Sequence, residues 1–436
     1  MSHAPAILFY GDDFTGATDT LGTAARAGLR TLLFLRVPDP TRLAAAGPLD
    51  CVGVAGAARA MGPAEMRAEL APVAALFAQL GARVLHYKLC STFDSAPQVG
   101  SIGVALQTLR AALPALQRTV LVGGQPDLGR YCLFGNLFAR AGADGEVHRI
   151  DRHPTMSRHP VTPMHEADLR QHLARQGLAA LRLAPWTLHA GGEAALDRAL
   201  DTSGEGGGVL FDVRDNADLG RIGAVLWRRA QHAPVLAAGA SSVVQALAPQ
   251  IAQAVPPAAS VASATGPVFA LAGSLSPVTA AQVAAATSFD VESIDPLALC
   301  TDDGFLQQQA DRLAARLQAG RHVLACTVRP GTAPVADAGV VARDLALAGG
   351  RLLRAVLQRA PRVRRVGVAG GDTSSLSLQA LDAWGLSYRG VVSSGVSLCR
   401  LHSDDPGLDG LEIALKGGQM GDADLFDRLV VGVPAG

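Results

Sequence analysis

Aromatic residues and an excess of charge are both scarce in this chain. Phe, Trp and Tyr make up 4% of its 436 residues, which is too few for the base-stacking surfaces that single-stranded nucleic acids require. Lys+Arg and Asp+Glu number 38 each, so the chain has no surplus of positive charge to attract nucleic acid or an anionic membrane. We therefore expect no nucleic-acid partner.

Long apolar runs and paired cysteines are missing as well. No run of eighteen apolar residues occurs, and no basic region followed by an apolar stretch stands at the start of the sequence, so we expect neither a membrane span nor secretion. The six cysteines are scattered without a CxxC pair, which indicates reduced thiols in the cytosol rather than disulfides or a zinc site. These features predict a cytoplasmic protein with no membrane partner.

The length and the hydrophobic pattern predict two α/β domains. A chain of 436 residues that is 49% hydrophobic is too long for one core and apolar enough for two. Short apolar runs alternate with longer amphipathic segments, which is typical of mostly parallel sheets flanked by helices. The uncharged segment Gln253–Pro267 is rich in Pro, Ala, Ser and Thr and is interpreted as a linker. We expect domains at 1–258 and 259–436.

The alternation of apolar runs and amphipathic segments predicts where the individual strands and helices lie. In the first domain strands are expected at Ala6–Tyr10, Thr31–Leu35, Cys51–Ala55, Val84–Tyr87, Thr119–Val122 and Val209–Asp212, and helices at 64–80, 98–113, 165–175 and 217–230. In the second domain strands are expected at Val268–Ala272, Val323–Thr327 and Val366–Ala369, with helices from Thr279, across 338–360 and after Asp372.

The first polar segment, Gly11–Asp19 (GDDFTGATD), directly follows a predicted strand. Neighbouring side chains at a strand end point to opposite sides, so one of Asp12 and Asp13 would face a cleft while the other caps the next helix. A carboxylate in a cleft can accept a proton from a substrate hydroxyl or help to hold a metal. We favour Asp13 as the catalytic residue, because Thr15 beside it can help to fix a hydroxyl. The alternative that both carboxylates only shape the turn stays open.

The second polar segment, Lys88–Ser95 (KLCSTFDS), also ends an apolar run. Lys88 offers a cation for an acid group, and Ser91, Thr92 and Asp94 offer hydrogen bonds to hydroxyl groups. Together these side chains suit a polyhydroxy acid, although an ordinary polar turn would have the same composition.

Arg130 follows the glycine-rich segment Gly123–Gly129. Its guanidinium group can bind a carboxylate or a phosphate with two parallel hydrogen bonds. A surface arginine in a loop is an equally simple interpretation.

Three histidines, His153, His159 and His165, recur every six residues among prolines. Proline prevents the helix that would bring two of them onto one face, and a zinc site needs closer pairs with further ligands. We interpret this segment as an extended loop that lines a substrate cleft or joins parts of the domain, and we expect no zinc site in it. The sequence leaves metal-binding residues elsewhere unknown.

The second domain carries three glycine-centred segments, Gly273–Thr279, Gly370–Ser374 and Lys416–Gly421. The first two follow a predicted strand and open a predicted helix, where exposed N–H groups and the helix dipole favour a phosphate. Lys416 adds a cation on a flexible loop. None of the three matches GxxxxGK[ST] or GxGxxG, and each alone is explained as well by a structural turn.

Taken in order, these segments resemble the four-carbon acid sugar kinases, a family that includes D-threonate, D-erythronate and 3-oxo-tetronate kinases. The motifs that carry the resemblance span nearly the whole chain: GDDFTGATD, KLCSTFDS, HPVTPM, GSLSPVTAAQ, GGDTS and LKGGQMG. The resemblance implies an N-terminal domain that binds the sugar acid, a C-terminal domain that binds ATP, and an active site in the cleft between the two domains.

The resemblance also implies a reaction: an ATP-dependent kinase, assisted by Mg²⁺, phosphorylates a terminal hydroxyl of a short sugar acid or oxo-sugar acid. Asp13 or Asp12 would act on the attacking hydroxyl. Substrate binding is expected at Thr15, Lys88, Ser91, Thr92, Asp94 and Arg130, and ATP binding at Ser274, Ser276, Gly370, Gly371, Asp372, Thr373, Lys416, Gly417 and Gly418.

Other interpretations remain. A sugar-acid-binding or sensing protein that has lost catalysis would keep the same fold, although the intact carboxylates and Lys416 argue against it. A dehydrogenase would need a GxGxxG turn, which opens neither domain. The chain departs from many family members at Ala96–Gly103 and at Ser374–Leu376. The first departure concerns the acid-binding side, so the identity of the substrate stays open. For the assembly of the protein, the expectation is a homodimer.

Overall fold

The computed structural model describes residues 4–116, 119–141, 145–159, 161–201, 207–257, 259–273, 276–327 and 342–434. The chain divides into two compact units, Met1–Pro256 and Pro257–Gly436. In the described ranges, no helix is both long and apolar enough to cross a membrane.

The first unit is built on a parallel sheet whose strands lie in the order β2-β3-β1-β4-β11-β5-β10-β9. The strands are β1 Ile7–Gly11, β2 Thr31–Phe34, β3 Cys51–Ala55, β4 Val84–Lys88, β5 Thr119–Gly123, β9 Leu181–Ala184, β10 Gly208–Asp212 and β11 Val235–Gly239. Every residue of β1, β3, β4 and β11 is buried, as expected where helices cover both faces of a sheet.

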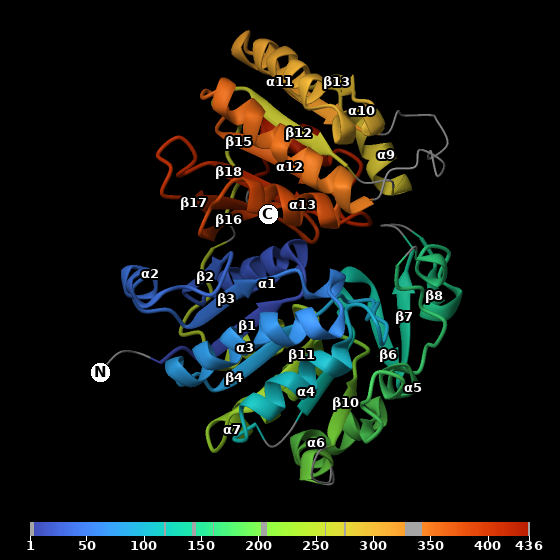
Figure 1. The fold of residues 1–436 in the computed structure, drawn as a ribbon. Helices are drawn as coiled ribbons and strands as arrows, with labels where there is room; N and C mark the ends of the chain where they lie inside the picture. The colour runs from blue at the N-terminus through green and yellow to red at the C-terminus, as the bar shows by residue number, and fades with distance from the viewer. Residues whose placement is uncertain are drawn as a thin grey trace. The chain divides into compact units, whose positions relative to one another are not determined.

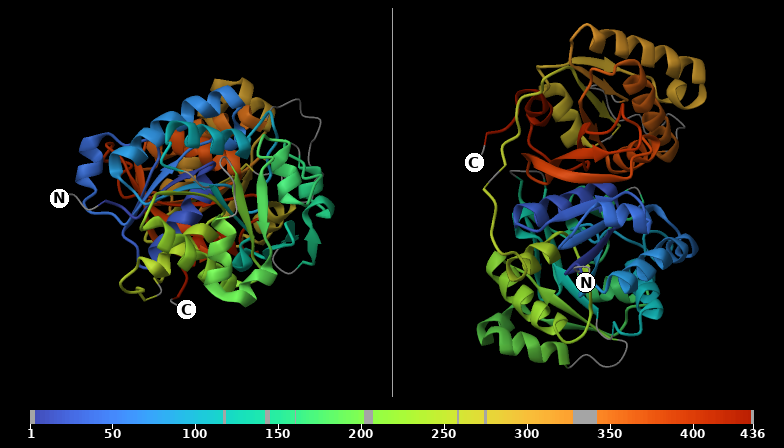
Figure 2. Two further views of the ribbon diagram at one scale, coloured as in Figure 1. Left: turned by 90° about the horizontal axis from the view of Figure 1, so that it is seen from below. Right: turned by 90° about the vertical axis from the view of Figure 1, so that its left-hand side faces the viewer.

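Helices pack on both faces of this sheet (Figures 1 and 2). They are α1 Phe14–Arg26, α2 Pro40–Ala45, α3 Pro63–Leu80, α4 Ile102–Ala112, α5 Leu169–Ala174, α6 Gly192–Asp201, α7 Asn216–Ala230 and α8 Ser242–Leu247. Helix α3 contacts α4, while α8 contacts both α1 and α7.

The path of the chain through the first sheet locates a ligand-binding edge. From β1 the chain passes through α1 to β2 on one side, and from β3 it passes through α3 to β4 on the other side of β1. The connection therefore reverses between β1 and β4. In open α/β sheets, ligands bind outside the carboxyl ends of the strands at such a reversal.

A small antiparallel sheet, β6-β7-β8, belongs to the first unit. Its strands are β6 Arg130–Leu133, β7 Asn136–Arg140 and β8 Val147–Arg149. A backbone bridge between Cys132 and Val213 ties β6 to the chain after β10.

The second unit has a sheet with the order β13-β14-β12-β15-β18-β17-β16, in which β17 is antiparallel to β16 and β18 and the other pairs are parallel. The strands are β12 Val268–Ala272, β13 Asp290–Ser293, β14 Val323–Cys326, β15 Arg365–Ala369, β16 Gly385–Ser393, β17 Val396–His402 and β18 Glu412–Lys416. Here the connection reverses between β12 and β15.

The helices of the second unit are α9 Pro277–Ala285, α10 Pro296–Thr301, α11 Asp303–Gln318, α12 Ala342–Arg359, α13 Gly371–Ala380 and α14 Leu425–Val431. Helices α11, α12 and α13 pack side by side (Figure 1), and α14 packs with α9. Phe289 and Phe426, with ring centres 6.3 Å apart, join a core of small and branched side chains from the strands.

The predicted fold class, two α/β domains with mostly parallel sheets flanked by helices, is confirmed. Each predicted strand agrees with the structure to within one residue at both ends. The helix predicted at 98–113 begins at Ile102, because Ser101 caps it by accepting a hydrogen bond from the Val104 N–H. Residues 338–341 of the predicted long helix lie outside the described residues.

Candidate active site

Asp12 and Asp13 follow β1 at the reversal point of the first sheet. Asp13 is the N-cap of α1: its Oδ1 accepts from the Gly16 N–H at 2.9 Å, and its Oδ2 accepts from the Thr15 hydroxyl at 2.6 Å. Asp12 makes neither contact. From the sequence, we expect Asp13 to face the substrate and Asp12 to cap the helix. The second part is wrong: Asp13 is the cap, because it stands one residue closer to the first free N–H groups of α1.

Arg59, which sequence reasoning missed, holds both carboxylates. It lies in the short 3₁₀ helix Ala58–Ala60 after β3 and donates to Asp12 Oδ1 at 2.8 Å and Oδ2 at 3.3 Å. Its third nitrogen lies 3.0 Å from Asp13 Oδ2. The available signal was its position: β3 lies next to β1, so a charged residue just after β3 reaches the same edge of the sheet.

Lys88, the last residue of β4, lies 3.5 Å from Asp13 Oδ1 through its Nζ. Strands β1 and β4 are neighbours, and Gly11 is in register with Lys88. A Cβ atom at Gly16 would overlap the Nζ of Lys88, so glycine is needed there for the close approach. Lys88 is buried, with 4% of its surface exposed.

The two carboxyl groups differ in acidity. Burial raises the pKa of Asp12, although the Arg59 guanidinium opposes the shift. Burial also disfavours the charge of Asp13, but Arg59 and Lys88 together outweigh it and hold the pKa of Asp13 well below its usual value. Asp12 is thus the stronger base of the pair, and Asp13 is a fixed negative charge.

The loop after β4 carries Thr92 and Asp94, which hydrogen-bond to each other and are both buried. Ser91 is half-buried, and its hydroxyl makes no hydrogen bond to the described part of the chain. Asp94 also contributes to the raised pKa of Arg59, which puts this loop within electrostatic range of the two aspartates.

Arg130 begins β6 and is 9% exposed. No carboxylate among the described residues lies within ion-pair distance of it. The one hydrogen bond that its guanidinium group makes there goes to the Leu128 carbonyl, and its buried Nε has no partner. Burial lowers the pKa of Arg130. A buried guanidinium without a counter-charge costs free energy unless an anion binds it.

A further polar cluster, also missed, lies at the carboxyl ends of β5 and β11. Gln125 donates to Ser241 Oγ at 3.1 Å and to Asp19 Oδ2 at 3.4 Å, and Ser241 donates to the same carboxylate oxygen. Asp19 ends the segment GDDFTGATD, so the structure joins this segment to two strands that sequence spacing could not relate to it.

Two of the three histidines, His153 and His159, cap the local backbone, whereas His165 is exposed. The Nδ1 of His153 accepts from the N–H groups of Thr155 and Met156, and the Nδ1 of His159 accepts from the Thr162 N–H. Among the described residues no group of three His, Cys, Asp or Glu side chains is arranged to hold a metal ion.

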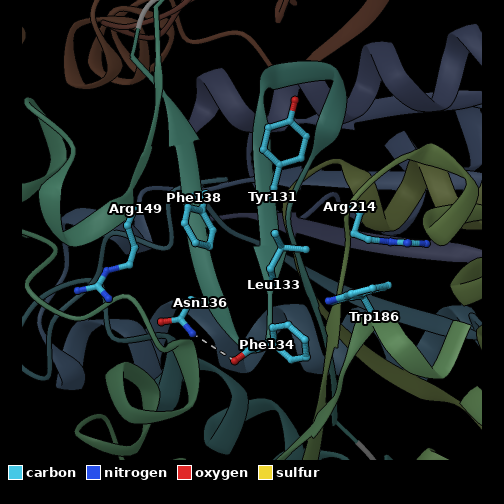
Figure 3. A pocket seen from close by; sticks show the side chains of 8 residues that line it. All are labelled: Tyr131, Leu133, Phe134, Asn136, Phe138, Arg149, Trp186 and Arg214. Atoms are coloured by element: carbon cyan, nitrogen blue, oxygen red, sulfur yellow. Dashed lines mark hydrogen bonds between the residues drawn. The ribbon is translucent and has the colours of Figure 1, made fainter.

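A pocket of about 660 Å³ lies on the small sheet and contains none of the predicted site residues. Figure 3 shows Tyr131 and Phe138 on neighbouring strands and the Trp186 ring beside Arg214, whose guanidinium carbon is 4.7 Å from the ring centre. Side chains alternate along β6, so Tyr131 faces this pocket while Arg130 points to the buried side.

In the second unit, the three glycine-centred segments meet at one sheet edge. Ala272, Ala369 and Lys416 are in register as the ends of β12, β15 and β18. Ser276 caps α9 and donates to the Gly418 carbonyl at 2.6 Å. Ser274 lies outside the described residues.

Lys416 is the buried cation of this edge, with 2% of its surface exposed. Its Nζ donates to Thr279 Oγ1 and to the Gly418 carbonyl, and in the described chain no carboxylate pairs with it. Burial lowers the pKa of Lys416 to about 7. Gln282 supports the same loop by donating to the carbonyls of Gly421 and Asp422, each at 2.9 Å.

The start of α13 is open. Gly370 has φ +125°, which favours glycine. Apart from the chain neighbours of Gly371 and the backbone of its own helix, no atom of the described residues lies within 4 Å of a Cβ placed at Gly371. Asp372 in the first turn is exposed. Thr373 is buried against Gly273, where any Cβ would overlap its hydroxyl.

Comparisons with known proteins match a separate family model to each of the two parts of the chain. Residues 7–247 match the model of a sugar-binding N-terminal domain, and residues 269–426 match the model of a nucleotide-binding C-terminal domain. A solved structure from Salmonella typhimurium LT2 has a TM-score of 0.78 and 25% identity and covers 97% of this chain and 98% of its own. One from Haemophilus influenzae has a TM-score of 0.71 and 22% identity, with the same coverage.

Full-length curated relatives carry kinase names. A 3-oxo-isoapionate kinase from Paraburkholderia graminis is 40% identical and aligns over 99% of this chain and 95% of its own length. A 3-oxo-tetronate kinase from Cupriavidus necator is 32% identical, over 98% of this chain and 97% of its own. With both domain models matched and relatives similar over their whole length, the chain belongs to the four-carbon acid sugar kinase family.

Proposed function

We propose that the protein is an ATP-dependent kinase that phosphorylates a terminal hydroxyl of a short sugar acid. The observation that carries this proposal is a buried cation without a carboxylate partner in the described part of each unit, Arg130 in the first and Lys416 in the second. Each lies near the carboxyl ends of a parallel sheet, where anions bind. One anion is the carboxylate of the acid, and the other is the phosphate chain of ATP.

The acid is a 3-oxo acid. The relative at 40% identity is named for 3-oxo-isoapionate, whereas the Cupriavidus necator relative at 32% is named for 3-oxo-tetronate. We therefore propose 3-oxo-isoapionate as the first substrate to test and 3-oxo-tetronate as the second.

On the acid side, Arg130 and Lys88 bind the carboxylate. Arg130 supplies a guanidinium group that no described carboxylate neutralises, and Lys88 supplies a point charge that Asp13 holds in place. Thr15, Ser91, Thr92 and Asp94 bind hydroxyl groups, with the Ser91 hydroxyl left for the ligand.

Asp12 is the group that orients or deprotonates the attacking hydroxyl. Asp13 already binds an N–H, a hydroxyl and two cations, so its charge serves to position Lys88 and Arg59. Asp12 has Arg59 alone as its ionic partner in the described chain and the higher pKa of the two, which makes it the better base.

On the nucleotide side, the residues present fit ATP. Lys416 supplies a buried positive charge, Gly371, Asp372 and Thr373 supply N–H groups at the start of α13, and open space lies at Gly371. The Gly370 N–H donates to the Lys416 carbonyl at 2.8 Å, so Gly370 shapes the turn and does not bind the phosphate through its N–H. Gly417, Gly418 and the Ser276 hydroxyl complete the loop. Ser274 stays a predicted ligand.

Mg²⁺ fits this site with few protein ligands, because it is usually held by one or two carboxylates together with substrate phosphates. Asp372 is the exposed carboxylate beside the glycines and would hold it. When bound, the ion neutralises charge on the transferring phosphate.

The test is a turnover assay that reads ADP release with 3-oxo-isoapionate, 3-oxo-tetronate, threonate and erythronate. Turnover with one of the 3-oxo acids is expected. A protein that binds these acids by calorimetry and releases no ADP with any of them would be the non-catalytic binding protein instead. We further propose a homodimer in the cytoplasm, which sedimentation and cell fractionation would test.

A further inference from the structure

Three buried polar side chains of the first unit, Ser95, His172 and Gln176, have no role in the site described above. Ser95 directly follows Asp94 in the loop after β4. His172 belongs to α5, and Gln176 belongs to the turn after it. Only 4%, 7% and 5% of their surfaces, respectively, are exposed. Buried polar groups are kept where their hydrogen bonds fix a structure.

The three side chains bind one another. Ser95 Oγ lies 3.0 Å from His172 Nε2, and Gln176 Nε2 lies 2.8 Å from Ser95 Oγ and 3.1 Å from His172 Nε2. Burial lowers the pKa of His172, so the imidazole is neutral and can accept from the amide of Gln176. The Gln176 amide thus joins the other two side chains, and the Ser95 hydroxyl, which has a single proton, uses that proton for a bond outside the cluster.

The network holds the backbone of Phe93. Ser95 Oγ donates to the Phe93 carbonyl at 2.9 Å. Phe93 has φ +55°, a left-handed conformation that is uncommon for a bulky residue, and its ring is buried. Such a conformation costs free energy and persists only where its surroundings enforce it, and it is frequent at ligand sites.

The same conformation sets the direction of the two neighbouring side chains, Thr92 and Asp94. They stand on either side of Phe93 and hydrogen-bond to each other. A change of φ at Phe93 would rotate one of them relative to the other, because a backbone torsion lies between them.

The far end of the network contacts helix α4. Gln176 Oε1 accepts from the Gly103 N–H at 3.4 Å, at the start of α4. A Cβ atom at Gly103 would overlap the Gln176 carbonyl oxygen, so the turn after α5 and the start of α4 are in direct contact. The network is thus attached to a helix on the sheet and not to another loop.

We infer that His172 and Gln176 are positioning residues for the sugar acid: through Ser95 they hold Phe93 in its left-handed conformation and so fix Thr92 and Asp94 for substrate binding. The inference rests on the proposed assignment of the loop after β4 to the acid.

The test measures KM for the acid and for ATP in the full-length protein. His172→Ala and Gln176→Leu should each lower kcat/KM for the acid roughly tenfold to a hundredfold, as small misplacements of a binding group do, while KM for ATP stays unchanged. His172→Gln keeps a polar atom near the position of Nε2 and should restore much of the loss. Ser95→Ala combined with His172→Ala should cost no more than the larger single change, because both act through one network.

His189→Ala is the matched control. His189 is also a buried histidine of the first unit, with 4% exposure, but its ring nitrogens lie near Asp218, at 3.3 Å, and the Asp212 carbonyl, at 3.4 Å, instead. It should lower the melting temperature without altering KM for the acid. The inference is overturned if His172→Ala behaves like this control, or if it changes KM for both substrates alike.

Lys88→Ala separates this inference from the proposed function. If it raises KM for the acid and His172→Ala does not, the loop binds the acid and the positioning role is wrong. If Lys88→Ala leaves KM for the acid unchanged, the loop is not the acid site, and the inference falls with that assignment.

Discussion

Lys416 titrates near neutral pH because it is buried without a counter-charge from the described chain. A protonated amine binds phosphate and a neutral amine does not. Burial lowers the pKa of Lys416 to about 7, so above that pH the free protein must take up a proton to bind ATP.

ATP affinity should therefore be constant below pH 7 and should fall as pH rises, by up to about tenfold per pH unit. Titration calorimetry at several pH values measures this slope. Lys416→Met should bind ATP weakly and should lose the slope. Its folded state should become more stable at neutral pH, because the folded chain disfavours the charged amine and that penalty grows as pH falls from the pKa of an unfolded lysine towards 7. If Lys416→Met keeps the same pH dependence of ATP affinity, that dependence arises from another group.

Asp12 and Asp13 should respond differently to the same substitution. Asp12→Asn should lose about 10²–10⁴-fold in kcat, the usual contribution of a general base, with the fold retained. Asp13→Asn should instead lower the free energy of unfolding by about 3–5 kcal/mol, because Arg59 and Lys88 lose a buried partner.

Steady-state kinetics and thermal unfolding of both variants decide between the two roles. If Asp13→Asn is the variant that loses kcat while its stability is retained, the assignment favoured by sequence alone was right. If both turn over at the normal rate, the transfer needs no base, as its loose transition state would permit.

At the scale of elements, the turn between β15 and α13 offers a steric test. In the described chain, a Cβ at Gly371 would have no atom within 4 Å beyond its chain neighbours and its own helix backbone, so Gly371→Ala and Gly371→Val should both fold. Gly371→Val should weaken ATP binding by filling the space next to the N–H groups, and Gly371→Ala should do so less. Calorimetry with ATP and with the acid measures both affinities, and unchanged ATP affinity in the valine variant would place the phosphates elsewhere.

Elements were predicted well where their pattern is local. Strands such as β3 and β12 are short apolar runs ended by polar turns, and their predicted bounds match the structure. No comparable signal marks β11, whose residues Val235–Gly239 (VLAAG) are mostly small and are as typical of a helix as of a strand. This segment is a strand because it fills the place between β4 and β5, a contact that joins residues far apart in the chain.

At the scale of the whole molecule, the two ligands should stabilise the protein through separate residues. A ligand that binds only the folded state stabilises it by about 2.7 kcal/mol at a hundredfold excess over Kd. Arg130→Met should abolish the stabilisation by the acid and keep that by ATP, and Lys416→Met should do the reverse.

Thermal unfolding of the full-length protein with each ligand is the measurement. Arg149→Met is the control, because this arginine is exposed and paired with Asp151, and it should keep both responses. A loss of both responses in Arg130→Met would contradict the division of the two ligands between the units.

The sequence by itself determined the fold class, the strand ends and the polar segments that follow them, because apolar periodicity and turn chemistry are local properties of a chain. It also led to the family through the order of those segments. Only the tertiary structure decided which polar side chains meet. Arg59 reaches Asp12 because β3 lies beside β1, and His172 reaches Ser95 across 77 positions of the chain. It also decided how the two aspartates differ, because burial and the placement of Arg59 and Lys88 set their charges, and neither can be read from two identical adjacent residues.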